Sequence, residues 1–144
     1  MRTDILVAYD GSDLSKKAVE EAKKQTKLAE EAVLHVVTII SNSGPTVNAA
    51  LARSFMNDLA EEVRPAVDSV QEELEQEGIA CKTDILMDYS FRNPGAQLID
   101  YAKEKDIDLM VLGSRGLGGV GRLILGSVSS QVVHQAPCKV MIVK

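Results

Sequence analysis

The chain has 144 residues, of which 45% are hydrophobic and 26% charged, and its net charge is −5. These values are typical of one globular domain, residues 1–144, that builds its core without a metal or a disulfide. The acidic balance, 3% aromatic residues and the absence of Trp argue against nucleic-acid binding. No segment is typical of a membrane span or a secretion signal, so we expect a cytoplasmic protein in which Cys81 and Cys138 are free, buried thiols.

The first half of the chain predicts strand, helix, strand and helix. The apolar segment 5–9 is a strand that stops at the turn Asp10-Gly11-Ser12, and Ser12 or Asp13 can cap the helix that follows. Segment 32–40 is a second strand. Apolar residues three or four apart over 47–78 predict a long helix, which Pro65 should kink or divide.

The second half continues the alternation. Strands are predicted at 80–87, 109–112 and 140–143, with helices at 94–104 and 127–134 between them. Strands that alternate with helices indicate an α/β fold: a three-layer, Rossmann-like sandwich with a five-stranded, doubly wound parallel sheet and about four helices. If the first and fourth strands are neighbours, the loops at their carboxyl ends share one crevice, where ligands bind in such sheets.

The last thirty-two residues, from Gly113 onward, contain no Asp or Glu and begin with a glycine-rich stretch. Exposed backbone amides and cations suit a polyanion such as a nucleotide triphosphate. The spacing Gly113-x2-Gly116-x9-Gly126-Ser127 fits this role if a helix starts at Gly126, because the first amides of that helix would point at phosphates. A flexible loop followed by an ordinary helix cap would explain the same glycines.

Two better-known glycine motifs fit less well. Segment 116–121 matches the dinucleotide fingerprint G-x-G-x-x-G, but it follows the fourth strand rather than the first and no acidic residue comes after it. Segment 116–123 approaches a P-loop, yet Arg122 and Leu123 stand where lysine and a hydroxyl residue are required.

Taken in order, five segments resemble the universal stress protein family over essentially the whole chain. They are ILVAYDGS at 5–12, LHVV at 34–37, DLMVLGSRG at 108–116, LILGSV at 123–128 and APCKV at 136–140. The motif G-x2-G-x9-G-[ST] marks the family's ATP-binding branch, and this sequence matches it at each marked position.

The resemblance implies a fold similar to that of the adenine-nucleotide α-hydrolases and a site for ATP, with or without Mg²⁺. Asp10 and the backbone at Val36 would face the adenosine, beside Ala8 and Tyr9. The residues implied along the ribose and phosphates are Leu112, Gly113, Arg115, Gly116, Gly126, Ser127 and Val128. Asp10 can equally be a turn residue that caps the first helix, and Arg115 and Arg122 can be ordinary loop charges. Arg92 stands where the family often has glycine, so the resemblance does not predict which residues form the rim of the pocket.

The sequence favours an ATP-binding stress-response or signalling module with at most slow hydrolysis, because no general base or P-loop lysine is evident. We predict no catalytic residue and no metal site. His35 is interpreted as a satisfied polar residue of the sheet, and His134 as the end of a helix. The alternatives are a nucleotide-free protein-interaction module and an adenylating or ATP pyrophosphatase-type enzyme. The terminal strand predicts an unpaired edge, and the resemblance implies homodimers that pair residues 139–144 of two copies.

Overall fold

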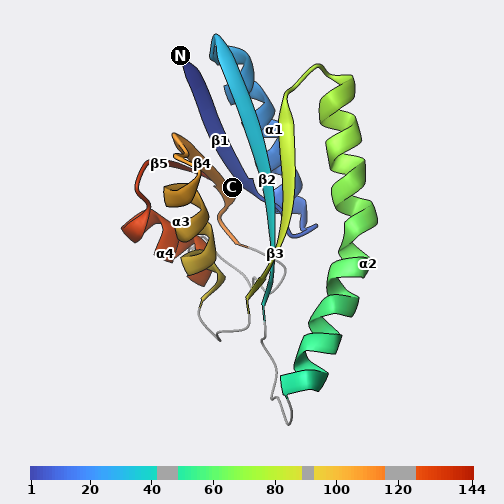
Figure 1. The fold of residues 1–144 in the computed structure, drawn as a ribbon. Coiled ribbons are helices and arrows are strands. Elements are labelled where there is room, and N and C mark those ends of the chain that lie inside the picture. The colour runs from blue at the N-terminus through green and yellow to red at the C-terminus, as the bar shows by residue number, and fades with distance from the viewer. Residues whose placement is uncertain (42–48, 89–92, 116–125) are drawn as a thin grey trace.

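A computed structural model describes residues 1–41, 49–88, 93–115 and 126–144 of the chain. Five parallel strands form one sheet in the order β3-β2-β1-β4-β5, and four helices join them (Figure 1). The strands are β1 (Arg2–Ala8), β2 (Glu31–Ser41), β3 (Cys81–Asp88), β4 (Leu109–Gly113) and β5 (Lys139–Val143). The helices are α1 (Asp13–Leu28), α2 (Ala49–Gln76), α3 (Pro94–Glu104) and α4 (Ser127–Gln135). The predicted α/β sandwich is thereby confirmed.

The centre of the sheet is β1, whose neighbours are β2 on one side and β4 on the other. Val7 is paired with Val36 of β2 and with Val111 of β4. The strand order therefore reverses at β1, and the loops that follow β1 and β4 leave the same edge of the sheet side by side. The condition that the sequence left open, adjacency of the first and fourth strands, is met.

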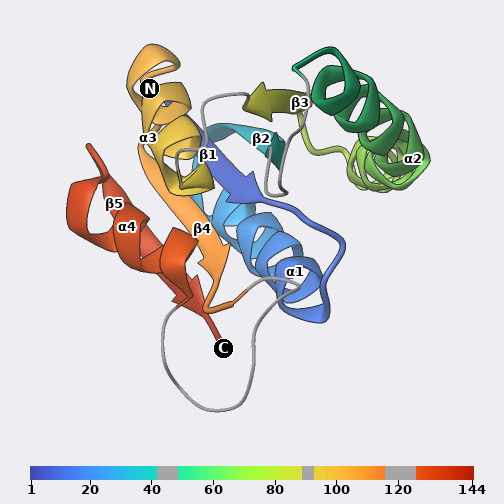
Figure 2. The ribbon, with the colours of Figure 1, turned by 90° about the horizontal axis from the view of Figure 1, so that it is seen from below.

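Two helices cover each face of the sheet (Figure 2). Successive side chains of a strand point to opposite faces, so Ile5 and Val7 pack with α1 and α2, while Leu6 between them packs with α3 and α4. All three side chains are at most 1% exposed. This double burial explains why the strand reads as a continuous apolar run instead of an alternating one.

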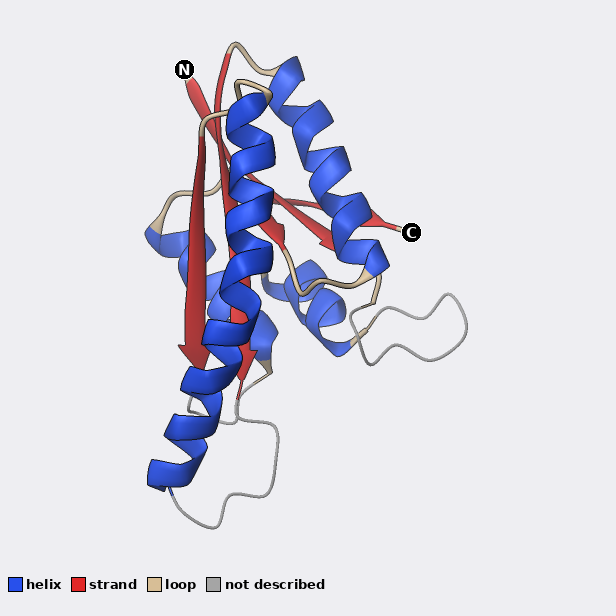
Figure 3. Ribbon diagram, turned by 90° about the vertical axis from the view of Figure 1, so that its right-hand side faces the viewer, coloured by secondary structure: helices blue, strands red, loops and turns tan. Residues whose placement is uncertain are grey.

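The long helix α2 runs alongside β3 and extends past the end of the sheet (Figures 1 and 3). Pro65 lies inside it but does not divide it, contrary to one of the two outcomes expected from the sequence. Proline removes one helical hydrogen bond, whereas packing anchors the helix on both sides of it. Met56 and Ala60 are buried before the proline, and Val67 and Leu74 after it.

One buried ammonium group joins α1 to α2. The Lys23 side chain is 5% exposed, and its Nζ lies 2.9 Å from Glu20 Oε1, 2.6 Å from Glu73 Oε1 and 2.7 Å from Glu77 Oε2. Burial alone would lower the pKa of Lys23, but its bonds to the three carboxylates outweigh that effect and raise the pKa well above its ordinary value. Lys23 therefore stays charged, and α1 is fastened to α2 by an ionic contact as well as an apolar one.

Several local expectations are confirmed at the level of single residues. Ser12 is the cap of α1, with its Oγ accepting a hydrogen bond from the Ser15 amide at 3.1 Å. The start of α3 is Pro94, preceded by Asn93, whose side chain accepts from the Gly95 amide at 2.8 Å. Cys81 and Cys138 are free but only partly buried. Within the described ranges, no helix is long and apolar enough to cross a bilayer.

Candidate functional site

A cleft lies at the carboxyl ends of β1 and β4, between the first turns of α3 and α4. Residues from both sides of the strand reversal meet there, as expected for a ligand site in an open parallel sheet. The described lining residues are Ala8, Tyr9, Asp10, Ser15, Val37, Ile39, Pro94, Leu98, Leu112, Gly113, Arg115, Gly126, Val128 and Ser129. One part of this wall is apolar and the other carries hydroxyl groups, a carboxylate and a guanidinium. Such a division suits a ligand with a flat apolar ring and a charged end.

The turn after β1 fixes Asp10 by its own side chain. Asp10 Oδ1 accepts a hydrogen bond from the Ser12 amide at 2.9 Å, and Gly11 has φ +82°, which side chains other than glycine's rarely permit. Asp10 thus has the turn role that the sequence left open, and it also lines the cleft. The two roles are compatible because a carboxylate has more than one acceptor site.

At the end of β4, packing against the start of α1 requires a glycine at position 113. A Cβ atom at this position would lie 2.9 Å from Leu14 Cβ, closer than packed carbon atoms come. The glycine therefore lets the start of α1 pass close to the end of β4, which places Asp10 beside the cleft. Gly113 also lines the cleft, and the close approach of phosphate to its backbone stays a prediction beside this structural role.

Gly126 precedes α4 and stands in a different situation. Its φ of −62° and ψ of 166° are open to other residues, and the nearest atoms of the described residues that a Cβ would meet lie 3.5 Å away, on Ser114 and Arg115. Its amide donates to the Ser114 carbonyl at 2.8 Å, so this amide is already used and does not point at a phosphate as predicted. The amides of Ser127, Val128 and Ser129 follow in the first helical turn, where helix geometry provides no carbonyl one turn earlier.

Ser129 was not predicted from the sequence, yet it fastens the two ends of the glycine-rich segment together. Its side chain is buried, and its Oγ lies 2.9 Å from the Ser114 carbonyl and 3.2 Å from the Gly126 carbonyl. The Ser114 amide in turn donates to Val143 of β5 at 2.8 Å. The side of the cleft at the start of α4 is therefore built on backbone that is held by hydrogen bonds. A serine three residues after a possible N-cap was the signal available in the sequence.

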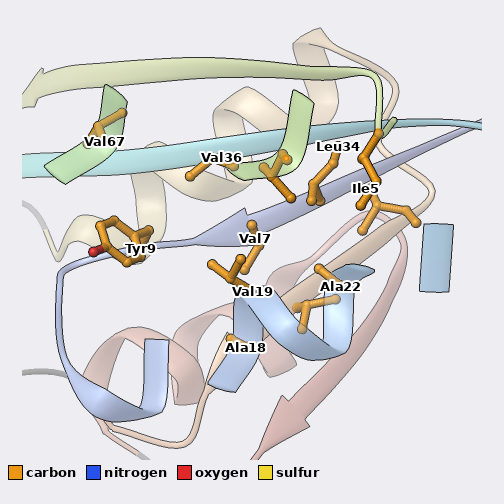
Figure 4. Packing of buried hydrophobic residues seen from close by; sticks show 12 residues of the cluster. Ile5, Val7, Tyr9, Ala18, Val19, Ala22, Leu34, Val36 and Val67 are labelled. Carbon is orange, nitrogen blue, oxygen red and sulfur yellow. The ribbon is translucent and has the colours of Figure 1, made fainter. Parts of the chain in front are cut away.

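The sequence prediction for β2 concerns the backbone at Val36, and the structure adds which side chains of this strand line the cleft. The Val36 side chain belongs to the cluster that packs with α1 and α2, on the opposite face of the sheet (Figure 4). Its neighbour Val37 lines the cleft together with Ile39. The offset of one residue follows from the alternation of side chains along a strand, which fixes the face only once the neighbouring helices are placed.

The remaining predicted residues divide into three groups. Ala8, Tyr9, Leu112, Arg115 and Val128 line the cleft, and their contact with a nucleotide stays a prediction. Ser127, the first residue of α4, is exposed and does not line it. Gly116 lies outside the described residues, as do Arg92 and Arg122.

Proline and apolar residues of α3 form a wall that the sequence analysis missed. Pro94 and Leu98 lie one turn apart and both line the cleft. Gly95 permits this arrangement, because a Cβ there would lie 3.1 Å from the Val128 carbonyl of α4. The close contact of α3 with α4 brings the apolar wall next to the first turn of α4, and it depends on a glycine whose role the sequence did not reveal.

A wider hollow, about 570 Å³ against about 190 Å³ for the cleft, lies between α1 and α2. Its lining includes Lys16, Lys17, Glu20 and Glu73. Both glutamates already bind Lys23, and no helix N-terminus supplies amides to it. Despite its smaller volume, the cleft at the strand ends has the chemistry of a ligand site.

Neither histidine belongs to the cleft. His35 is buried within the sheet and bonded on both ring nitrogens, which confirms its interpretation as a satisfied polar residue. His134 is exposed in the last turn of α4. Among the described lining residues, the side chains that titrate are those of Tyr9, Asp10 and Arg115.

Comparison with known proteins agrees with this architecture. The model of the universal stress protein family matches residues 1–144. The chain belongs to the universal stress protein family. It is 32% identical to the universal stress protein YxiE of Bacillus subtilis, with 100% of each chain covered. The universal stress protein UspA of Lactobacillus plantarum has the same fold, with a TM-score of 0.87 and 29% identity over 99% of this chain and 97% of that one.

Two solved members of the family with more distant sequences contain nucleotides. One is a universal stress protein in complex with cAMP, 23% identical, with a TM-score of 0.70 over 99% of this chain and 97% of that one. The other, from Archaeoglobus fulgidus in complex with dAMP, is 22% identical, with a TM-score of 0.65 over 99% and 98%. At these identities the likeness establishes the shared fold.

Proposed function

We propose that this protein binds ATP, with or without Mg²⁺, in the cleft between β1 and β4 and acts as a nucleotide-dependent stress-response or signalling module. The observation that supports this proposal most directly is the environment of Gly126. Among the described residues around it nothing requires a glycine there, since its backbone angles and the space left by these residues accept a side chain. The missing side chain leaves room for a ligand in front of the first turn of α4. Family members that contain cAMP and dAMP support an adenine nucleotide as that ligand.

The pose follows from the two parts of the wall. The adenine would lie against Val37, Ile39 and Leu98, and the ribose near Asp10. The phosphates would extend toward the amides of Val128 and Ser129 and the guanidinium of Arg115. Each favourably placed charge gains about 0.3–1 kcal/mol from the helix dipole, so several donors must act together to hold a triphosphate.

Slow hydrolysis at most is expected, because the described wall supplies no histidine and no lysine. Asp10 is bonded to the turn and lies at the proposed ribose end, away from the phosphates. Arg115 would be the one cationic side chain among the described lining residues, and these residues offer no base near the terminal phosphate, so the transition state for phosphoryl transfer lacks part of its usual stabilisation. We place the protein in the cytoplasm as a homodimer that pairs β5, the edge strand of the sheet, with its copy.

The test is direct. Protein purified without added nucleotide is denatured, and the supernatant is chromatographed for adenine nucleotide; the stripped and refolded protein is then titrated with ATP in a calorimeter. Released nucleotide and heat of binding are expected. An empty supernatant together with no heat would refute the proposal and favour a protein-interaction module.

Radiolabelled ATP distinguishes the enzyme alternative, because that alternative requires rapid formation of AMP and pyrophosphate. Sedimentation as a monomer at micromolar concentration would refute the dimer.

A further inference from the structure

A buried polar cluster lies on the face of the sheet that α3 and α4 cover, outside the nucleotide cleft. It consists of Asp4 of β1, His35 of β2, Asp84 of β3 and Tyr101 of α3. His35 is 2% exposed, Tyr101 6% and Asp4 7%, whereas Asp84 on the edge strand is partly exposed. Four elements of the fold therefore meet in one chain of polar contacts, which the proposed binding of ATP does not use.

Three short contacts connect the four side chains. His35 Nε2 lies 2.9 Å from Asp4 Oδ1, and His35 Nδ1 lies 2.9 Å from the Tyr101 hydroxyl. The same hydroxyl donates to Asp84 Oδ2 at 2.8 Å. Oxygen and nitrogen atoms at these separations are held together by a hydrogen between them. Three contacts thus require three hydrogens.

The side chains in their ordinary forms at neutral pH carry only two. Ionised aspartates contribute none, a neutral imidazole contributes one and the phenol contributes one. Because Tyr101 gives its single hydrogen to Asp84, its oxygen must accept one from His35 Nδ1. Asp4 also accepts only, so His35 Nε2 must donate as well. An imidazole that donates from both nitrogens is an imidazolium.

The other possible carriers of the third hydrogen are disfavoured by their surroundings. Burial would raise the pKa of Asp4, but hydrogen bonds from His35 and Arg2 outweigh it and hold the pKa below its ordinary value. Asp84 is partly exposed, so water can solvate its charged form. Burial, and then the bond to Asp84, raise the pKa of Tyr101, which therefore keeps its own hydrogen.

The other charged groups around His35 come from each neighbouring element. Arg2 lies on β1, where its Nε is 3.1 Å from Asp4 Oδ2. Lys82 of β3 is paired with His35 in the sheet and is exposed. Glu104 acts on Tyr101 from α3, and Asp108 accepts from the Asp4 amide at 2.8 Å. Carboxylates outnumber cations in this set, which favours a positive charge on the ring.

We propose that the Asp4-His35-Tyr101-Asp84 cluster is a proton-binding site, in which an extra proton on His35 holds α3 against the sheet and so favours nucleotide binding. The link to the nucleotide rests on the proposed function. Leu98 lies one turn before Tyr101 on α3 and, with Pro94, lines the cleft. When the proton leaves, the Tyr101 hydroxyl has one hydrogen for two acceptors. One contact then becomes a repulsion between lone pairs, and the helix that forms the apolar wall loses an anchor.

The protonation state is tested by nuclear magnetic resonance on protein labelled with nitrogen-15 in histidine. The sequence has two histidines, and the exposed His134 can be replaced in a His134→Gln background so that His35 gives the only signals. At about pH 7, close to where a free imidazole titrates, we expect both ring nitrogens of His35 to carry hydrogens. A single protonated nitrogen at that pH would overturn the proposal.

Asp84→Asn is the matched variant, because an amide can donate where a carboxylate cannot. Asn at position 84 can donate to the Tyr101 oxygen, Tyr101 to His35 Nδ1, and His35 Nε2 to Asp4, so all three contacts are kept with a neutral ring. We expect His35 to become neutral at the same pH while the protein stays folded. Tyr101→Phe removes the phenol and should neutralise the ring too. A ring that stays doubly protonated in both variants would contradict the hydrogen count.

The functional link is tested by ATP titrations at about pH 6 and about pH 8, on either side of the ordinary imidazole titration. In the wild-type protein the affinity should fall by about fivefold more than in Asp84→Asn, equivalent to about one net hydrogen bond. The ATP phosphates also titrate between these pH values, but this changes the affinity of both proteins equally. It therefore cancels when the fall in affinity of the wild-type protein is divided by that of Asp84→Asn. Equal pH dependence in the two proteins would refute the link. Absence of ATP binding at both pH values would refute the proposed function and the link together, while the resonance experiment still decides the proton site.

Discussion

Gly113 and Gly126 stand at the two ends of the glycine-rich segment, and they look equivalent in the sequence. The structure separates them. At Gly113 a Cβ would lie 2.9 Å from Leu14 Cβ, whereas at Gly126 the nearest atom of the described residues would be 3.5 Å away. Gly113 is therefore needed for the close packing of α1 against the end of β4, whereas the described residues around Gly126 do not require a glycine. If the proposed function holds, one glycine of the motif serves folding and the other serves binding.

The largest expected effect is the loss of ATP binding in Gly126→Val. The side chain would occupy the space in front of the first turn of α4 and block the approach of phosphate, while the backbone angles of position 126 remain acceptable. We expect no detectable heat in a calorimetric titration and a nearly unchanged melting temperature. An unchanged affinity would show that the ligand lies elsewhere. Gly126→Ala is the smaller step in the same direction and should give an intermediate affinity.

Gly113→Ala should affect stability first. Forcing a methyl group against Leu14 and the Arg115 carbonyl costs about 1–3 kcal/mol of the free energy of unfolding, as for other overpacked sites. Urea denaturation followed by circular dichroism measures this loss. In a Leu14→Gly background the same Gly113→Ala change should cost less, since glycine lacks the Cβ atom that the new methyl group would meet. A Gly113→Ala protein as stable as the wild type would remove the distinction between the two glycines.

Asp10→Ala should weaken ATP binding by about 1–2 kcal/mol, the scale of a hydrogen bond to a charged group. The same change removes the acceptor of the Ser12 amide, so Asp10→Asn, which keeps an acceptor oxygen for the turn, is the appropriate control. Calorimetric titration of both variants distinguishes the charge from the turn. Equal affinity of Asp10→Ala and the wild-type protein would exclude Asp10 from the site.

Ser129→Ala is expected to have the smallest effect, a loss of about 1 kcal/mol in the free energy of unfolding, because one buried hydrogen bond disappears. Since Ser129 Oγ contacts the Ser114 carbonyl, the loss should be accompanied by faster amide exchange at Gly126, the other group bonded to that carbonyl. Hydrogen exchange measures it. The exposed neighbour Ser127 offers a matched control, and Ser127→Ala should leave exchange at Gly126 unchanged.

Sequence patterns over a few neighbouring residues predicted the helices and strands well. They predicted poorly which residues meet when they lie far apart in the sequence. The start of α3 at Pro94 follows from the first-turn preference of proline, and β1 follows from an apolar run that both faces of a sheet can bury. Pro65 failed as a boundary because packing on both sides of it outweighs one lost hydrogen bond. For β2 the sequence indicated only the backbone at Val36. It could not indicate that the side chains of Val37 and Ile39 line the cleft, because a wholly apolar strand does not reveal which face its side chains occupy.

In the candidate site, too, features set by neighbouring residues could be predicted and contacts between distant segments could not. Asp10 and Gly126 could be found from the sequence because turn and cap chemistry is local. The role of Gly113 could not, since it depends on Leu14, about a hundred residues earlier in the chain. Likewise, Pro94 and Leu98 join the cleft only because Gly95 lets α3 approach α4. Contacts between segments distant in the sequence carry no periodic signal along the chain.

The ionic contact at Lys23 has a consequence for how this surface can evolve. Glu20, Glu73 and Glu77 all form an ion pair with the same ammonium group, that of Lys23. Each carboxylate can therefore neutralise this charge when one of the others is lost. Substitution of any single glutamate leaves the cation neutralised and should be nearly silent under selection, whereas replacement of Lys23 leaves three acids facing one another. Natural variants are therefore expected to drift at the three acidic positions and to keep the lysine.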